Sequence, residues 1–280
     1  MIGAALLVAC CAAPAAADRA TWSITPSAGG SARPYIYAEG TPGTTLEDKV
    51  AVTNPTAEPL RVALRGADAD NRADGALGVR AKARDTGAWI TFAEKSVKVP
   101  ARTRAEIPFT VTVPAGATPG DHPGAIVASA GGRQAGVSVH LRVSGPTLSA
   151  LTVEHVQVGG DAITYDVVNR GNTTLSPRLT VRADGVFGSV LDRPARTLPV
   201  ELLPGRRASL TEPWGDAPAL DAVDVKVTVT AGGGAADSAT ASARFVPWGA
   251  LAGALAVLAG AGAALTIHVR RRRQGQGSTP

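Results

Sequence analysis

Cysteine is nearly absent from this chain of 280 residues, and its only two cysteines, Cys10 and Cys11, stand near the start. The chain beyond them therefore has no thiol, which excludes disulfides, zinc–thiolate sites and thiol nucleophiles there. Its stability must come from a hydrophobic core. The remaining length, roughly 230 residues between the two ends, suffices for two domains of ordinary size.

Recognised catalytic motifs are missing as well. The four histidines are His122, His140, His155 and His268, and none pairs with a serine or aspartate at a known motif spacing. Neither G-x-S-x-G nor H-E-x-x-H occurs. We therefore expect no catalytic residue, no metal site and no cofactor, although a triad assembled by folding from distant positions stays open.

The chain also lacks a broad excess of charge. Its formal net charge is +5, from 28 basic and 23 acidic residues. Arg270–Arg273 account for four of the basic residues, which leaves 24 against 23 elsewhere. This balance is not that of a nucleic-acid-binding protein.

The N-terminal residues predict export. Residues 1–17, "MIGAALLVACCAAPAAA", are apolar and end in small residues, as a signal peptide does. No basic residue precedes the apolar stretch, so either the true start lies upstream or the signal is atypical. Leu7 to Cys10 also resembles a lipobox that would lipidate Cys10. The alternative is that Cys10 is a small apolar residue of an ordinary signal.

The C-terminal residues predict a membrane anchor. Trp248 to Val269 carry no charge, and Arg270–Arg273 follow them. Such a run rises roughly 33 Å as a helix, and arginines mark the cytoplasmic side. We predict a transmembrane helix over 247–269 and a basic cytoplasmic tail over 270–280, in a single-pass type I cell-membrane protein. Gly249 and Gly253 would allow a weak homodimer, although alanine-rich spans produce G-x-x-x-G by chance.

Short runs with a period of two predict strands between these ends. Residues 104–113, 135–145 and 221–231 alternate apolar and polar side chains. Such one-sided apolar strands are typical of antiparallel sheets packed face to face. The apolar members are Ile107, Phe109, Val111, Val113, Val137, Val139, Leu141, Val143, Val223, Val225, Val227 and Val229.

A faint internal repeat predicts two domains of the same kind. Residues 52–64 align with residues 167–179, so that Asn54 matches Asn169 at an offset of 115. We expect an all-β fold with two tandem immunoglobulin-like β-sandwiches, at 18–145 and 146–245, followed by one transmembrane α-helix.

An acidic stretch, "RGADADNRADG" at residues 65–75, offers oxygen ligands from Asp68, Asp70, Asn71 and Asp74. The spacing lacks the glycine and glutamate positions of a helix–loop–helix calcium site. Three interpretations stay open. The stretch is a polar connection with a turn at Asp74, an oxygen-ligated ion site, or a surface that contacts a ligand.

Aromatic residues provide further candidates for ligand contact. Tyr35 and Tyr37 share one face of a predicted strand and could stack on a sugar. Trp89, Ile90 and Phe92 form an apolar strand that serves either the core or sugar stacking. His122 is expected to be a hydrogen-bonded corner residue.

Motifs from Trp22 to Ser129 resemble one known family. "WSITPSAGG", "YIYAEGTPGTTLEDKVAVTN", "RGADADNRADG", "WITF" and "HPGAIVAS" occur in this order. Together they resemble the peptidoglycan-binding domain of WxL-interacting proteins, of an actinobacterial type. The resemblance implies a non-enzymatic cell-surface protein that binds peptidoglycan or a wall-associated protein. The candidate ligand-binding residues are Tyr35, Tyr37, Asp68, Asp70 and Asn71. The alternative function is a protein–protein interaction scaffold or adhesion module that uses an exposed sheet edge.

Overall fold

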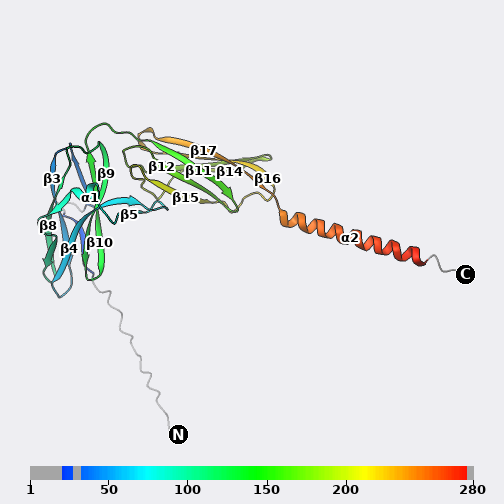
Figure 1. The fold of residues 1–280 in the computed structure, drawn as a ribbon, viewed down its shortest axis with the longest axis horizontal. Coiled ribbons are helices and arrows are strands. Elements are labelled where there is room, and N and C mark those ends of the chain that lie inside the picture. Colours follow the sequence, from blue (N-terminus) through cyan, green and yellow to red (C-terminus); the bar gives the residue numbers. More distant parts are fainter. Residues whose placement is uncertain (1–20, 28–32, 276–280) are drawn as a thin grey trace, which may run out of the picture. The chain divides into compact units, whose positions relative to one another are not determined.

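The computed structural model describes residues 21–27 and 33–275, and these residues form β-sheets followed by one long helix (Figure 1). The predicted signal peptide, with Cys10, lies outside the described residues. The strands are β1 (Ser23–Pro26), β2 (Ile36–Gly40), β3 (Thr45–Asn54), β4 (Leu60–Asn71), β5 (Leu77–Val79), β6 (Ile90–Phe92), β7 (Ser96–Val99), β8 (Thr103–Thr112), β9 (Gly120–Ala130), β10 (Arg133–Val143), β11 (Leu151–Gly159), β12 (Ala162–Asn169), β13 (Arg178–Gly185), β14 (Gly188–Thr197), β15 (Arg207–Pro213), β16 (Asp221–Thr230) and β17 (Ala236–Phe245). The helical elements are α1 (Thr86–Trp89), the 3-10 turn η1 (Gly232–Gly234) and α2 (Trp248–Gly275).

The chain divides into two compact units, and each is assembled from separate segments. The first unit comprises Met1–Asp68, Arg80–Ala117 and Pro123–Leu141. The second unit comprises Ala69–Val79, Thr118–His122 and Arg142–Pro280. The tip of the β4–β5 hairpin and the residues that lead into β9 therefore belong to the second unit.

The first unit contains two sheets of a β-sandwich. One has the order β1-β3-β8-β6, and the other has the order β2-β10-β9-β4-β5 with β7 also paired to β4. The β3–β8 ladder is antiparallel and runs without interruption from Thr45↔Thr112 to Asn54↔Thr103. The apolar side chains expected to be buried in β8 and β10 are all buried. The period of two thus predicted the buried face of these strands.

The second unit contains a three-stranded sheet, β11-β12-β15, and a four-stranded sheet, β14-β13-β16-β17. The predicted valines of β16 are buried, as are Tyr165 of β12 and Trp214, which follows β15. Burial raises the pKa of the Tyr165 phenol, and the nearby Glu212 carboxylate raises it further. The prediction of an all-β fold with β-sandwich sheets is confirmed.

A buried carboxylate joins the edges of the two sheets in the second unit. Glu212 lies in the edge strand β15, and its side chain points inward. Its two oxygens accept hydrogen bonds from Arg193 and Arg196 of β14, the edge strand of the other sheet. Edge strands with inward charges resist pairing with foreign strands, so this ion pair protects that side of the sandwich.

Helix α2 covers the segment for which the sequence predicts a transmembrane helix over 247–269. Across the described residues, however, no helix combines the length and the apolar character required to span a bilayer. The β-sheet part of the predicted fold therefore holds, and the membrane-spanning part is not confirmed.

The short strand predicted at residues 89–92 needs a small correction. Trp89 ends the helical turn α1, and only Ile90–Phe92 form β6. Ile90 is buried, and the ring of Phe92 lies 6.1 Å from the ring of Phe109. These contacts support the core-packing interpretation of this segment.

The internal repeat corresponds to two buried asparagines at equivalent strand ends. The side-chain amide of Asn54 donates hydrogen bonds to the carbonyl oxygens of Glu58, Val99 and Pro100, at 2.8, 3.2 and 3.0 Å. Its Oδ1 accepts from the backbone N–H of Thr56 at 3.1 Å. The side chain thus replaces the strand partners that the chain loses where it turns away from β3.

Asn169 repeats this arrangement at the end of β12. Its amide donates to the carbonyl oxygens of Thr173 and Leu202 at 2.7 and 3.0 Å, and its Oδ1 accepts from the N–H of Gly171 at 2.9 Å. Thr173 and Gly171 occupy the positions of Glu58 and Thr56 shifted by the same offset of 115 residues. The repeat therefore gives both units the same hydrogen-bonded turn at the end of a strand.

We predict that Asn54→Ala destabilises the first unit and Asn169→Ala the second, each by about 2–3 kcal/mol, because buried carbonyl groups lose their donors. Urea unfolding followed by tryptophan fluorescence would measure both losses. Gln157→Ala, at an exposed position of β11, is the control and should change stability by less than about 0.5 kcal/mol. Equal stabilities for all three variants would contradict this role of the asparagines.

Candidate binding edge of the first unit

Strand β2 lies at the edge of its sheet. It ends the sheet order β2-β10-β9-β4-β5, so among the described strands only β10 pairs with it. Ile36 is buried, whereas Tyr35 before it and Tyr37 after it are exposed. The two tyrosines lie on the same side of the chain, as the alternating pattern predicts.

A shallow groove runs beside this edge. It encloses about 190 Å³ and is lined by residues of β2, β3 and β8. Buried Ile36, Phe109 and Val111 give it an apolar base. Glu47 and Asp48 add carboxylates to its lining, next to Tyr37. The groove can therefore accept an apolar side chain of a ligand that carries a positive charge next to it.

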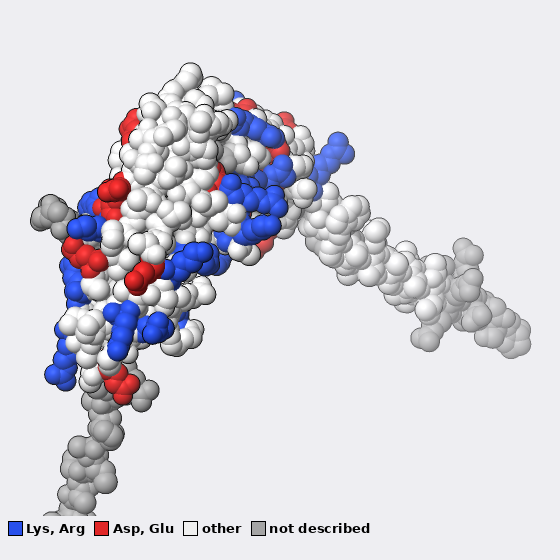
Figure 2. Space-filling view, turned by 60° about the vertical axis from the view of Figure 1, so that its left-hand side comes forward, with Lys and Arg blue, Asp and Glu red and all other residues white. Residues whose placement is uncertain are grey.

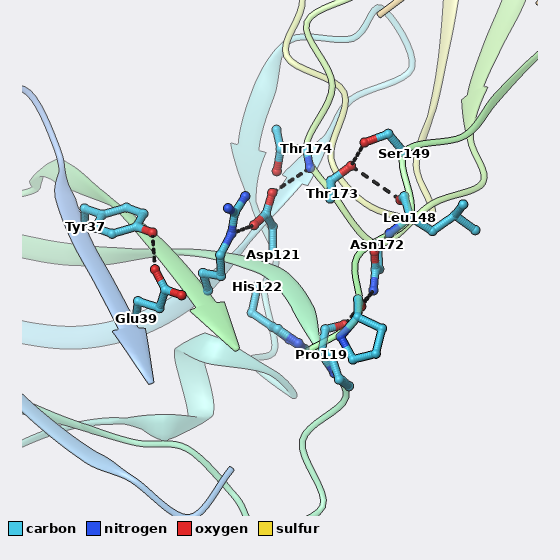
Figure 3. Close-up of polar contacts among 12 residues, drawn as sticks. Tyr37, Glu39, Pro119, Asp121, His122, Leu148, Ser149, Asn172, Thr173 and Thr174 are labelled. Atoms are coloured by element: carbon cyan, nitrogen blue, oxygen red, sulfur yellow. Dashed lines mark hydrogen bonds and ion pairs between the residues drawn. The ribbon is translucent and has the colours of Figure 1, made fainter. Parts of the chain in front are cut away.

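Internal contacts hold the side chains around the groove. The Tyr37 hydroxyl donates to Glu39 Oε2 at 2.7 Å (Figure 3). The rings of Tyr35 and His140 stack with their centroids 4.4 Å apart. Arg33 forms an ion pair with Asp48 at 3.1 Å. The exposed rings are thus partly preorganised for stacking against a ligand.

The acidic stretch at residues 65–75 serves the fold in this structure. Asp68 is buried, and its carboxylate accepts hydrogen bonds from the backbone N–H groups of Arg84, Asp85 and Gly87, at 2.7, 3.2 and 2.8 Å. A Cβ at Gly87 would lie 2.3 Å from the Ala67 carbonyl carbon, so only glycine fits there. Asp68 therefore fixes the entry into α1 against β4.

The next candidates lie at the tip of the β4–β5 hairpin, within the second unit. Asp70 forms an ion pair with Arg206 at 2.9 Å. The Asn71 amide donates to the carbonyl oxygen of Glu201 at 2.8 Å, and its Oδ1 accepts from the N–H of Leu203 at 2.9 Å. Asp68 belongs to the first unit, as do Tyr35 and Tyr37, whereas Asp70 and Asn71 belong to the second unit. The polar-connection interpretation needs a correction, because β4 continues to Asn71 and only the residues between β4 and β5 form the turn that contains Asp74.

A second set of polar contacts in the second unit carries no recognisable sequence signal. Asp121 pairs with Arg142 at 2.8 Å and accepts from the N–H of Thr174 at 2.8 Å (Figure 3). The Asn172 amide donates to the carbonyl oxygens of Pro119 and Pro146, at 2.8 and 3.0 Å. These residues fasten the turn after β12 to Thr118–His122.

The histidines take structural positions. His122 Nε2 lies 2.8 Å from the carbonyl oxygen of Thr118, as expected for a hydrogen-bonded corner residue. His155 Nδ1 lies 3.0 Å from Asp166 Oδ2 on an exposed sheet face. Residues 21–27 and 33–275 contain no group of three or more His, Cys, Asp or Glu side chains that could hold a metal ion.

An ionic cluster links β11, β12 and β15 on the outer face of the second unit. Glu154 pairs with Arg170 and with Arg207, the latter at 3.0 Å. A hydrogen bond from the Thr152 hydroxyl lowers the pKa of Glu154, and the Arg170 guanidinium lowers it further. The cluster is solvent-accessible, so it contributes little to stability.

Comparison with known proteins reveals similarity of fold. No family model matches the chain, and no curated protein matches it. The family resemblance of residues 22–129 therefore stays a prediction.

Solved structures of fimbrial chaperones resemble the chain at low sequence identity. One from the chaperone–tip adhesin complex of CFA/I fimbriae has 10% identity and a TM-score of 0.44, and the match covers 80% of this chain and 98% of that one. The Escherichia coli chaperone DraB has 10% identity and a TM-score of 0.39, with coverages of 80% and 96%. A chain of the CsuC–CsuE pre-assembly complex of Acinetobacter baumannii has 10% identity and a TM-score of 0.40, with coverages of 68% and 90%. The likeness concerns the fold alone.

We predict that calcium leaves the thermal unfolding midpoint unchanged relative to excess EDTA, because Asp68, Asp70 and Asn71 already have partners within the protein. Asp68→Ala should destabilise the protein by about 2–3 kcal/mol through the loss of charge-assisted hydrogen bonds. Asp216→Ala, at an exposed turn position outside the acidic stretch, is the control. A calcium-dependent rise of the midpoint that disappears in Asp68→Ala would instead establish an ion site.

Proposed function

We propose that this chain is a non-enzymatic binding protein whose first unit binds an extended segment of a partner protein along β2. The position of β2 at the edge of its sheet, beside the apolar groove, carries this proposal. An added strand would hydrogen-bond along the outer edge of β2, and alternate side chains would enter the groove. The carboxylate of Glu47 favours a basic residue in the bound segment.

A second candidate function is the binding of peptidoglycan. Its support is the pair of exposed rings of Tyr35 and Tyr37, which present flat apolar faces to a sugar. The motif resemblance between Trp22 and Ser129 points to the same class of ligand. Both candidate functions use the edge of β2, so experiments at Tyr35 and Tyr37 can distinguish between them.

Site-specific photocrosslinking on intact cells tests the first candidate. A photoreactive amino acid at Tyr37 should yield a discrete protein adduct, and the same amino acid at the exposed Thr91 of β6 should yield none.

Retention on purified, protein-free cell wall tests the second candidate. The double variant Tyr35→Ala, Tyr37→Ala should then bind about tenfold more weakly. No adduct from Tyr37 and no retention of the full chain would contradict both.

We further propose that α2 holds the protein at the cell membrane, with the two units exported. The described side chains of α2 include exposed Leu255, Val257, Leu258, Leu265 and Ile267, and the uncharged stretch of the helix is visible in Figure 2. A helix with apolar residues around its whole circumference needs an apolar environment. The arginines at 270–273 complement anionic lipids.

Membrane attachment predicts that the full chain sediments with membranes and stays there after alkaline carbonate extraction. Leu258→Glu combined with Val257→Glu should release the protein, because charges within an apolar helix are costly in lipid. Gln157→Glu, at an exposed position of β11, serves as the control. Complete extraction of the unaltered chain would contradict the attachment.

A further inference from the structure

An exposed apolar turn projects from one end of the second unit. Strands β13 and β14 are joined by Val186 and Phe187, which lie between Gly185 and Gly188. The Phe187 side chain is 82% exposed and that of Val186 is 72% exposed. Two-residue hairpin turns are usually polar, so two large apolar residues at the tip are costly in water.

The fold holds this turn in a fixed position. The buried Asp221 carboxylate accepts a hydrogen bond from the N–H of Val186 at 3.0 Å. A Cβ on Gly185 would lie only 2.1 Å from that carboxylate, so glycine allows the close approach. Gly188 has a φ of +123°, which other residues rarely adopt. The sequence thus specifies a tip that presents Val186 and Phe187 to the surroundings.

The same end of the sheet leads into α2. Asp221 pairs with Phe245 at the end of β17, and Gly185 pairs with Val223 two residues further along β16. The turn is therefore level with the end of β17. Because β13 and β17 flank β16, they are separated by two strand spacings, or about 10 Å.

Only Val246 and Pro247 separate β17 from α2. Such a link spans at most about 11 Å from Phe245 to Trp248. Exposed Leu220, in the loop that enters β16, and exposed Trp248 add apolar surface at this end. If α2 enters the bilayer from Trp248, Phe245 stays within about 11 Å of the point of entry, so this end of the sandwich stays close to the headgroup region, which is about 5–7 Å thick on each side.

We propose that Val186, Phe187 and Leu220 insert into the lipid surface and seat the second unit on the membrane beside α2. This proposal rests on the membrane attachment through α2 proposed above. The apolar side chains of the turn would leave water and enter the boundary between the headgroups and the acyl chains, as interfacial apolar residues do. The second unit would thereby keep a fixed orientation relative to the membrane.

Fluorescent labelling of single cysteines in the full chain tests this insertion. Cys10 and Cys11 are replaced by alanine, and one cysteine is introduced at Phe187, Leu258 or Gly232 and labelled with an environment-sensitive dye. Gly232 lies in the β16–β17 turn at the other end of the same sheet, and a Cβ there meets nothing within 4 Å. The chain is then reconstituted in vesicles of phosphatidylcholine with a minor fraction of phosphatidylglycerol.

We expect the dyes at Phe187 and Leu258 to shift to shorter wavelengths and to be quenched by spin-labelled lipid, whereas the dye at Gly232 stays water-exposed. A lipid-quenched dye at Leu258 with a water-exposed dye at Phe187 would overturn the tip insertion and leave the attachment intact. Water-exposed dyes at both positions would overturn both proposals. Equal quenching at Phe187 and Gly232 would show adsorption of the whole unit, and would also overturn the proposed insertion of the tip.

Discussion

The buried asparagine at a strand corner is the interaction on which both units depend. A β-sandwich must turn its chain from one sheet to the other, and the turning backbone loses its strand partners inside the core. Asn54 and Asn169 supply the missing donors and acceptors with one side chain each. An apolar residue would leave these carbonyl groups unpaired, and a charged residue would be costly to bury. The sheets around them can then be built from simple alternation of valine, leucine and isoleucine.

Much of the fold could be predicted from the sequence because burial on one face of a strand leaves a period of two. The buried faces of β8, β10 and β16 follow from this period alone, and the corner asparagines follow from the repeat at an offset of 115 residues. The assembly of the second unit could not be predicted in this way. Its contacts through Asn71, Asp121 and Asn172 join segments far apart in the chain, and isolated polar residues carry no periodic signal.

The candidate site, too, could be predicted from the sequence only in part. The exposure of Tyr35 and Tyr37 follows from their alternation with Ile36. The acidic stretch at 65–75 looks like a ligand-binding surface in the sequence because carboxylates cluster there. In the structure, Asp68 satisfies the backbone of α1, and Asp70 neutralises Arg206. Short-range composition does not distinguish a carboxylate that binds an ion from one that completes a turn, since the distinction lies in partners remote in sequence.

Strand β2 gives the protein a surface that can bind a ligand in two ways, by backbone hydrogen bonding and by aromatic stacking. Hydrogen–deuterium exchange of the full chain, with and without an extract of cell-envelope proteins freed of wall polymer, tests its role most directly. The account predicts slower exchange in Ile36–Gly40 on addition of the extract, with β6 and the β16–β17 turn unchanged. Unchanged exchange in β2, or protection confined to the second unit, would contradict it.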